Sequence, residues 1–273
     1  MIRNVRIETL EQLTPLLTEQ EYRPDLLRNR SPYLYRGMSN SSFCMVTSLR
    51  RNCKDLQQRL EPAILKNFAK YAEAEDPEIS HSIWRQMILG QHHGLPTRLL
   101  DWSRSALVAL HFAVSEDNLA LMDAHDCMVW RIDIKEVHAL LPQAYRETLE
   151  KAQAEVFTVE LLRQVTDSLS EYDRDMGGHA MALLEPPSLG SRIITQYAHF
   201  AVVPTGMDNV ETFLEENTSN TVKYVIDRKL RWRVRDMLDE LNMSERIVYP
   251  GLDGLSAWIG RHYYVKDRPE GQA

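Results

Sequence analysis

The sequence predicts an α+β fold in which small, mainly antiparallel sheets pack against helices, with one helical insert. Two segments, "CMVWRIDI" at 127–134 and "TVKYVID" at 221–227, alternate apolar and polar residues as strands do. Other segments, such as 55–74 and 79–92, repeat apolar residues at helical spacing. These elements follow one another without a regular βαβ repeat, which favours a mixed α+β architecture over a parallel sheet.

The composition limits the classes of function. The 273 residues are 44% hydrophobic, enough to bury a full core, and carry a formal net charge of −7. An acidic chain does not suit a general nucleic-acid coat, although a local basic groove for nucleic acid stays open. Three cysteines, Cys44, Cys53 and Cys127, are too few and too scattered for a disulfide framework or a zinc cluster.

Targeting signals are absent from the sequence pattern. The first residues, "MIRNVRIETLEQL", lack an apolar core of signal-peptide length, and no apolar run approaches the length of about 18 residues that a membrane helix needs. We therefore expect a soluble, cytoplasmic protein with no membrane partner.

The N-terminal part is expected to contain a helix followed by strands. Thr9 and Gln12 fit a capping box that opens a helix in "TLEQLTPLLTEQ", so residues 1–29 are expected to form a helical lead. The alternation in "YLYRG" at 33–37 predicts a strand, and a second short strand is expected around "FCMVTSL" at 43–49.

The middle of the chain is expected to be mainly helical. Gly94 can take the left-handed conformation that ends the helix over 79–92, and Ser103 or Ser105 can cap the next helix, "SALVALHFAVS". That helix is apolar nearly all round, so we expect it to be central. Residues 135–180 are polar and acidic with a weak helical period, and we expect them to form an inserted helical arm.

The last third is expected to return to strands before two helices. "SRIITQYAHFAVVP" predicts two short strands with a tight bend, and "RIVYPGLDGLSAWIGRHYY" predicts a strand, a Pro-Gly turn and a final helix. "KLRWRVRDMLDELNM" predicts an amphipathic helix. Its arginines, Arg231, Arg233 and Arg235, are expected to lie largely outside the buried stripe, on a solvated face.

Polar residues suited to catalysis or ligand binding occur in two places. Arg36 lies in the predicted strand "YLYRG", where its guanidinium fork suits a phosphate or a carboxylate, although a structural salt bridge is the commoner use of an arginine on an edge strand. The stretch "GQHHGLPTRLLDWS" at 90–103 combines a helix exit with many polar groups, and we expect it to line a polar cleft. Within it, Arg98 and Asp101 are expected to pair and hold the turn together.

The two histidines of this stretch, His92 and His93, lie on different helix faces. Neither H-E-x-x-H nor C-x-x-C accompanies them, so no metal site is expected. One of them suits a general acid or base, a hydrogen-bond donor or a cap for helix carbonyls. The chain contains no G-x-S-x-G, G-x-G-x-x-G or P-loop motif, so a hydrolase triad and the common nucleotide sites have no support.

Several separate motifs together resemble the FRG domain, a family named for an aromatic-Arg-Gly motif, here Tyr35, Arg36 and Gly37. The others are "TSLRR" at 47–51, "GQHHGLPTRLLDWSRSALVALHFA" at 90–113, "VWRIDI" at 129–134, "RIITQYAHFAVV" at 192–203 and "RIVYPGLDGL" at 246–255. The resemblance implies an FRG domain over residues 30–260, with 135–180 as an insert and 261–273 as a tail. It implies no particular reaction.

A weaker similarity connects the chain with ADP-ribosyltransferases. Those enzymes carry an Arg-Gly pair on an early strand, then a Ser/Thr-rich strand, then a late strand with a glutamate ahead of an aromatic residue. By this similarity Arg36 orients NAD as a clamp for its phosphates and ribose, and Tyr35, Gly37 and Ser48 shape the pocket. The late segment has Gln196 and Arg192 but no glutamate, with the nearest ones at Glu185 and Glu245.

Three classes of function follow. The first is an NAD-dependent, ADP-ribosyltransferase-like enzyme, with NAD as its substrate and a macromolecular acceptor, acting as a bacterial toxin or phage-defence effector. The second is a nucleotide or nucleic-acid processing enzyme, in which Arg36, His92, Arg98 and Arg192 converge on a phosphate, as in RNA 2′-phosphotransferases of the related fold. The third is a non-catalytic domain that recognises a partner protein. The first predicts that Arg36 and Gln196 face one cleft.

Overall fold

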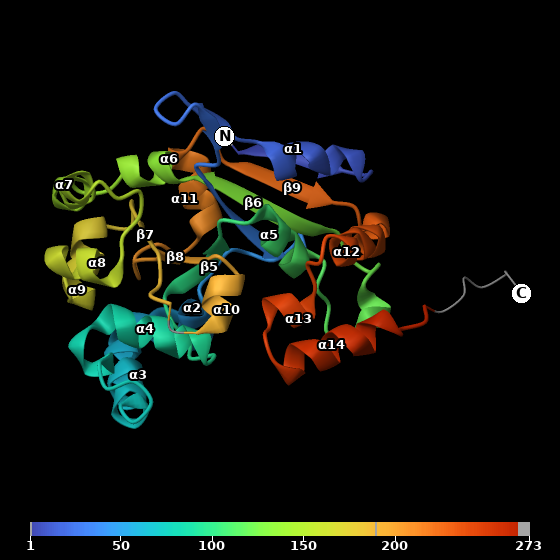
Figure 1. Cartoon of the computed structure of the whole chain (residues 1–273). Helices are drawn as coiled ribbons and strands as arrows, with labels where there is room; N and C mark the ends of the chain where they lie inside the picture. Colours follow the sequence, from blue (N-terminus) through green and yellow to red (C-terminus); the bar gives the residue numbers. More distant parts are fainter. Residues whose placement is uncertain (1, 189, 267–273) are drawn as a thin grey trace, which may run out of the picture.

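The computed structural model describes residues 2–188 and 190–266, and it confirms the predicted α+β fold (Figure 1). One seven-stranded sheet, rather than several small ones, forms its centre, in the order β1-β9-β6-β4-β5-β8-β7. Among these strands β1 and β9 pair in parallel, and the other pairs are antiparallel. The strands are β1 (Arg3–Ile7), β4 (Tyr33–Met38), β5 (Leu99–Ser103), β6 (Cys127–Asp133), β7 (Ala182–Leu184), β8 (Ala198–Val202) and β9 (Val222–Ile226), with β2 (Glu21–Arg23) and β3 (Arg28–Arg30) in a separate hairpin.

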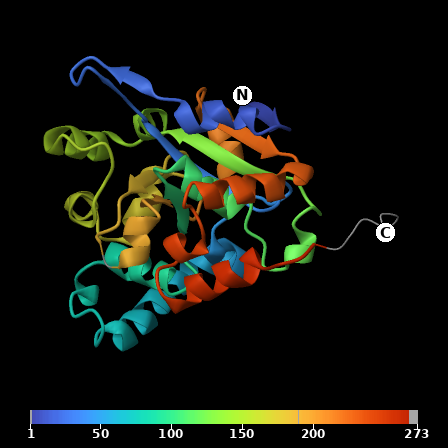
Figure 2. The same cartoon turned by 45° about the vertical axis from the view of Figure 1, so that its right-hand side comes forward.

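Helices surround this sheet, and Figure 2 shows the red C-terminal helices in front of it. Their bounds are α1 (Thr14–Thr18), α2 (Ser48–Cys53), α3 (Gln57–Ala72), α4 (Ile83–His92), α5 (Ala106–Ala113), α6 (Ile134–Ala139), α7 (Gln143–Ala152), α8 (Val159–Val165), α9 (Leu169–Met176), α10 (Ser191–Thr195), α11 (Val210–Asn217), α12 (Arg231–Glu240), α13 (Glu245–Val248) and α14 (Leu252–His262). The expected left-handed glycine after α4 is confirmed, since Gly94 has a φ of +82°.

The alternation along β4 assigns its side chains to two different cores. Tyr33 and Tyr35 pack with α5 and α12 on one face of the sheet, in the core that also holds Leu110 and Val234. Leu34 packs on the opposite face with α11 and with alternate residues of β6, such as Trp130. The apolar helix α5 lies against β4, and Ser105 caps it, as expected.

Residues 135–180 form the four helices α6 to α9, and their apolar residues belong to the main body of the protein. Tyr145, Phe157 and Tyr172 are buried together with α4 and with the strands β5, β7 and β8. The hydroxyl of Tyr172 donates to the carbonyl of Val202 at 2.6 Å and accepts from the amide of Ala182 at 2.9 Å. A buried hydroxyl with both partners ties α9 to the β7–β8 pair.

Three segments predicted to be strands are not strands. Residues 43–49 lead into α2, because the Thr47 hydroxyl accepts from the amide of Arg50 and caps that helix. Residues 191–195 form α10, after which Tyr197, with a φ of +48°, turns the chain into β8. "RIVY" lies mostly in α13, whose last turn is closed by the amide of Tyr249 donating to the carbonyl of Glu245.

The N-terminal residues hold more than the expected helical lead. The helix α1 is present, but β1 precedes it and the hairpin β2–β3 follows it. β1 forms its ladder with β9, as in the pairing of Val5 with Tyr224. A partner more than 200 residues away leaves no local signal in the sequence, because parallel pairing joins distant segments.

Two of the α12 arginines contradict the expected solvated face. Arg231 and Arg235 are fully buried. Arg231 donates to the carbonyls of Ala113, Ser115 and His125, and so satisfies carbonyls at the end of α5. Arg235 donates to His111 Nδ1 at 2.8 Å and to the Met243 carbonyl. Arg233 is exposed, as expected.

The predicted pair between Arg98 and Asp101 is wrong. Arg98 pairs instead with two carboxylates from the helices α3 and α9. It is buried and donates to Glu61 on α3 through Nε and Nη2, and to Asp173 on α9 through Nη1 at 2.6 Å. Asp173 also accepts from the amide and hydroxyl of Thr205. The ion pairs hold Arg98 in the charged form despite its burial and raise its pKa above the ordinary value.

The Arg98 cluster generates a stability prediction. Replacing Arg98 with Met leaves two buried carboxylates without their cation, so the free energy of unfolding should fall by about 3–5 kcal/mol. Chemical denaturation measures this loss. The matched control is Arg23→Met, which removes the exposed pair with Asp25 and should cost less than about 1 kcal/mol. A loss for Arg98→Met as small as that of the control would contradict the prediction.

Two buried histidines predict that acid destabilises the fold. Burial lowers the pKa of His111 to about 3, with the charge of Arg235 adding to the effect, and burial lowers the pKa of His138 to about 4. Between pH 6.5 and 5 these histidines bind protons in the unfolded chain but stay neutral in the folded chain. Each histidine should therefore lower the free energy of unfolding by about 2 kcal/mol over that interval. Denaturation at several pH values measures the fall.

The control for this prediction is His138→Gln. Glutamine offers the amide of Leu183 an acceptor in place of His138 Nε2, which accepts at 3.0 Å, but it cannot be protonated. The variant should therefore lose less stability between pH 6.5 and 5 than the wild type. An identical pH dependence in both proteins would show that His138 does not contribute.

Candidate functional site

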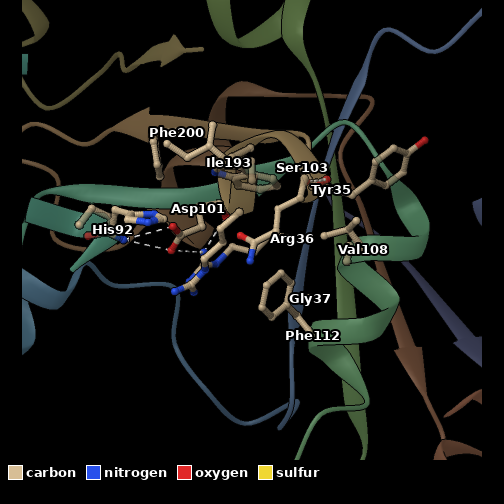
Figure 3. Close-up of a pocket in the computed structure, with 16 residues that line it drawn as sticks. Tyr35, Arg36, Gly37, His92, Asp101, Ser103, Val108, Phe112, Ile193 and Phe200 are labelled. Carbon is tan, nitrogen blue, oxygen red and sulfur yellow. Dashed lines mark hydrogen bonds and ion pairs between the residues drawn. The ribbon is translucent and has the colours of Figure 1, made fainter. Parts of the chain in front are cut away.

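A cavity of about 260 Å³ opens where β4, β5 and β8 meet the ends of α4, α5 and α10 (Figure 3). Polar and aromatic side chains share its wall. The lining residues are Tyr35, Arg36, Gly37, Gln91, His92, Asp101, Trp102, Ser103, Val108, Ala109, Phe112, Arg192, Ile193, Gln196, Ala198 and Phe200. The site thus combines parts of the chain that are more than 150 residues apart.

Arg36 is an incompletely paired cation in this cavity. Its Nη1 donates to the carbonyl of Asp101 at 2.6 Å and lies 3.7 Å from Asp101 Oδ2. Its Nε is buried and has no hydrogen-bond partner among the described residues. Burial lowers the pKa of Arg36 below its ordinary value, which the carboxylate of Asp101 only partly opposes. An anion in the cavity would stabilise this guanidinium.

The position after Arg36 requires a glycine, because α5 lies directly against the β4 backbone there. A Cβ at position 37 would lie 1.9 Å from the carbonyl oxygen of Ala109 and 2.6 Å from the amide nitrogen of Ala113. Because α5 approaches the β4 backbone this closely, any side chain at position 37 would push the helix away. The motif therefore sets the distance between Arg36 and the α5 wall of the cavity.

Asp101 lines the same cavity, although it was expected to pair with Arg98 and hold the turn together. Its carboxylate accepts from Gln91 Nε2 at 3.3 Å and 3.1 Å, and Gln91 Oε1 in turn accepts from the hydroxyl of Thr97 at 2.6 Å. Figure 3 shows Asp101 between Arg36 and His92. The pattern of β5 carries a signal for this position, because a charged residue stands alone between buried apolar ones in "LLDWS".

Arg192 and His92 form the other polar wall. The guanidinium carbon of Arg192 lies 4.8 Å from the centre of the Tyr249 ring, a cation–π contact, and no ion pair to Arg192 is found among the described residues. Burial lowers the pKa of His92, and the charges of Arg192 and His93 add to this effect. The wall is therefore electropositive and has a neutral histidine beside its cation at pH 7.

Gln196 borders the cavity but is also part of the framework. Its side-chain Nε2 donates to the carbonyl of Val248 at 3.1 Å, and its backbone carbonyl accepts from the hydroxyl of Ser103 at 2.6 Å. These bonds connect the end of α10 to α13 and to β5. Arg36 and Gln196 thus face one cleft, the arrangement that the NAD hypothesis requires.

Six of the eight site residues suggested by the sequence line this cavity: Tyr35, Arg36, Gly37, His92, Arg192 and Gln196. The ring of Tyr35 points away from Arg36 into the core, and its hydroxyl lies 3.3 Å from Ser31 Oγ (Figure 3). Ser48 and Arg98 lie elsewhere. Ser48 exchanges hydrogen bonds with the backbone of Thr97, and Arg98 belongs to the ion cluster described above, so both support the start of β5 from outside the cavity.

A second cavity, of about 800 Å³, adjoins the first, because His92 and Arg192 line both. Its other walls come from the end of α5, from α13 and from α14, and include Tyr249 and Glu245. Although burial opposes it, hydrogen bonds from Arg261 lower the pKa of Glu245. Glu245 is therefore already paired with an arginine, Arg261.

Residues 2–188 and 190–266 contain neither a metal-binding cluster nor a membrane-spanning helix. No group of three or more His, Cys, Asp or Glu side chains in these ranges is arranged to hold a metal ion. In the same ranges no helix combines the length and the apolar character needed to cross a membrane.

Comparison with known proteins gives one family match, which covers about a third of the chain. Residues 31–120 match the model of the FRG domain, a shorter span than the motifs had suggested. No curated protein and no solved structure matches the chain. The matched span holds Arg36, Gly37, His92 and Asp101, while Arg192 and Gln196 lie beyond it. The aromatic-Arg-Gly motif and the helix exit at 90–103 both lie within this match, so residues 31–120 are the part of the chain that is similar to the FRG domain.

Proposed function

We propose that this protein is an NAD-dependent, ADP-ribosyltransferase-like enzyme that binds the dinucleotide in the two adjoining cavities. The observation that carries the proposal is the convergence of Arg36, Arg192 and His92 on one partly enclosed site. Two guanidinium groups without full ion pairing favour a ligand with negative charge. The pyrophosphate of NAD offers such charge, and the guanidinium of Arg36, which lines the cavity, can donate to it.

The shape of the site suits a ligand with both aromatic and charged parts. Trp102, Phe112 and Phe200 line the smaller cavity and offer apolar contact to a heteroaromatic ring such as nicotinamide. At about 260 Å³ this cavity is too small for a whole dinucleotide, and the adjoining space of about 800 Å³ gives room for the remainder. Arg192, which lines both, stands where the phosphates would pass from one to the other.

The reaction class follows from these contacts. Cleavage of NAD breaks the bond between ribose C1′ and the nicotinamide nitrogen, and an acceptor nucleophile then bonds to C1′ and loses a proton. Holding the ribose and the phosphates in one geometry lowers the entropic part of the barrier. The acceptor is water or a macromolecule, and consumption of NAD would suit a toxin or a phage-defence effector.

A second candidate function uses the same cations. Two arginines and a histidine around one cavity also suit the processing of a phosphate ester in a nucleotide or nucleic acid. Competition separates the candidates. Binding of inorganic phosphate or of a nucleoside monophosphate, without nicotinamide release from NAD, favours phosphate processing. A domain that only recognises a partner protein would bind neither, and Arg36→Ala would then lower stability alone.

The principal prediction concerns Arg36. Arg36→Ala removes the charged donor and should weaken NAD binding by about 100-fold, while Arg36→Lys keeps a charge without the fork and should lose less. Calorimetric titration measures the affinity, and thermal melting shows that the variants are folded. Arg50→Ala is the matched control, because Arg50 lies outside both cavities. An unchanged affinity in Arg36→Ala would reject the proposal.

His92 predicts how binding depends on pH. Its pKa is low in the free protein, and the negative charge of a bound pyrophosphate should raise it, so binding takes up a proton. The affinity for NAD should therefore increase as the pH falls from 8 towards 5.5, whereas the NAD phosphates themselves do not titrate there. His92→Asn should show no such increase. Equal pH dependence in both proteins would remove His92 from the phosphate site.

A further inference from the structure

Asp101 supplies the carboxylate of the smaller cavity. No other Asp or Glu of the described residues lines this cavity. Its neighbours along β5, Leu100 and Trp102, are buried, while the Asp101 side chain is 62% exposed. Asp101 stands on β5, which lies between β4 and β8, the two other strands that line the cavity. A ligand in this cavity therefore lies beside the carboxylate.

The carboxylate is held in place without being neutralised. Gln91 Nε2 donates to both oxygens, and the hydroxyl of Thr97 fixes the other end of the Gln91 amide. An amide orients a carboxylate but carries no charge. Arg36 is directed mainly at the Asp101 carbonyl, 2.6 Å away, and stands 3.7 Å from Oδ2. Asp101 therefore keeps free lone pairs for a ligand.

This arrangement accounts for the polar stretch at 90–103. The α4 exit and the start of β5 place Gln91 and Asp101 side by side although they are 10 residues apart. Thr97 in the turn between them completes the chain of hydrogen bonds. The stretch is therefore built to present one oriented carboxylate beside Arg36.

We infer that Asp101 is the catalytic carboxylate of this site and that Gln91 is its positioning residue, an inference that rests on the proposed cleavage of NAD. When the bond between C1′ and the nicotinamide nitrogen breaks, its electron pair leaves with nicotinamide and the ribose becomes positively charged. Asp101 stabilises that charge and accepts a hydrogen bond from a ribose hydroxyl. The acceptor oxygen or nitrogen then bonds to C1′ and releases its proton to solvent.

The role fits the electrostatics of the cavity. Arg36 and Arg192 favour the phosphates but disfavour a positive charge on the ribose, so a nearby anion has to offset them. A glutamate on the late strand is absent, and Glu245 is paired with Arg261 in the adjoining cavity. Asp101 is the carboxylate in the position that the reaction needs.

The experiment measures nicotinamide release and NAD binding in the full-length protein. Asp101→Asn should lower kcat by about 10²–10³-fold while the Kd for NAD changes less than about threefold, because the positive charge on the ribose develops only in the transition state and the amide oxygen of Asn can still accept from the ribose hydroxyl. Asp101→Glu should recover part of kcat. Asp55→Asn, an exposed aspartate outside both cavities, is the control.

The outcomes separate this inference from the proposed function. A wild type that neither binds NAD nor releases nicotinamide overturns both. Release that persists in Asp101→Asn overturns the role of Asp101 and leaves the NAD enzyme standing. Equal losses of binding and of kcat would also overturn it, since they would show a binding residue and not a catalytic one.

The role of Gln91 is tested by asking whether its effect on kcat depends on Asp101. Gln91→Leu should lower kcat by about 10-fold in the wild type and have no further effect in the Asp101→Asn background, because it acts through that carboxylate. Equal losses in both backgrounds would mean that Gln91 supports the fold independently of Asp101, and would overturn its positioning role.

Discussion

The buried cation of Arg98 is the constraint on which the rest of the architecture depends. Its guanidinium joins β5 to Glu61 on α3 and to Asp173 on α9, segments that are far apart in the chain. A buried charge is costly unless every donor is used, so these three elements have to assemble together. β5 is thereby fixed in the sheet at the position where it also carries Asp101, and stability and site geometry meet in one strand.

The elements that the sequence predicts well are those with strong local patterns. The alternation of β4, β6 and β9, the capped apolar helix α5 and the helix exit at Gly94 all follow from neighbouring residues. The failures have a common cause. "SRIIT" and "RIVY" contain β-branched residues with high strand propensity, but hydrogen bonds to nearby carbonyls and packing against other elements make them short helices. Such tertiary effects are invisible in a single window of sequence.

The candidate site was predictable to a similar extent. Arg36 and His92 stand in motifs with a clear chemical meaning, and both line the cavity. Arg98 and Ser48 stand in equally distinctive motifs but serve the framework, because a polar residue next to a turn satisfies backbone groups as readily as it binds a ligand. Asp101 carried a weak signal, a lone charge in an apolar strand. Burial of Arg231 and Arg235 had none, since arginines usually face solvent.

The strand order means that the cavity is completed late in the synthesis of the chain. β5 lies between β4 and β8, yet β8 is synthesised about 95 residues after β5. Until then β5 is an edge strand, and Arg192 and Gln196 do not yet exist. A growing chain therefore carries Arg36, His92 and Asp101 without the wall that encloses them. A prematurely terminated product would therefore hold only part of the site.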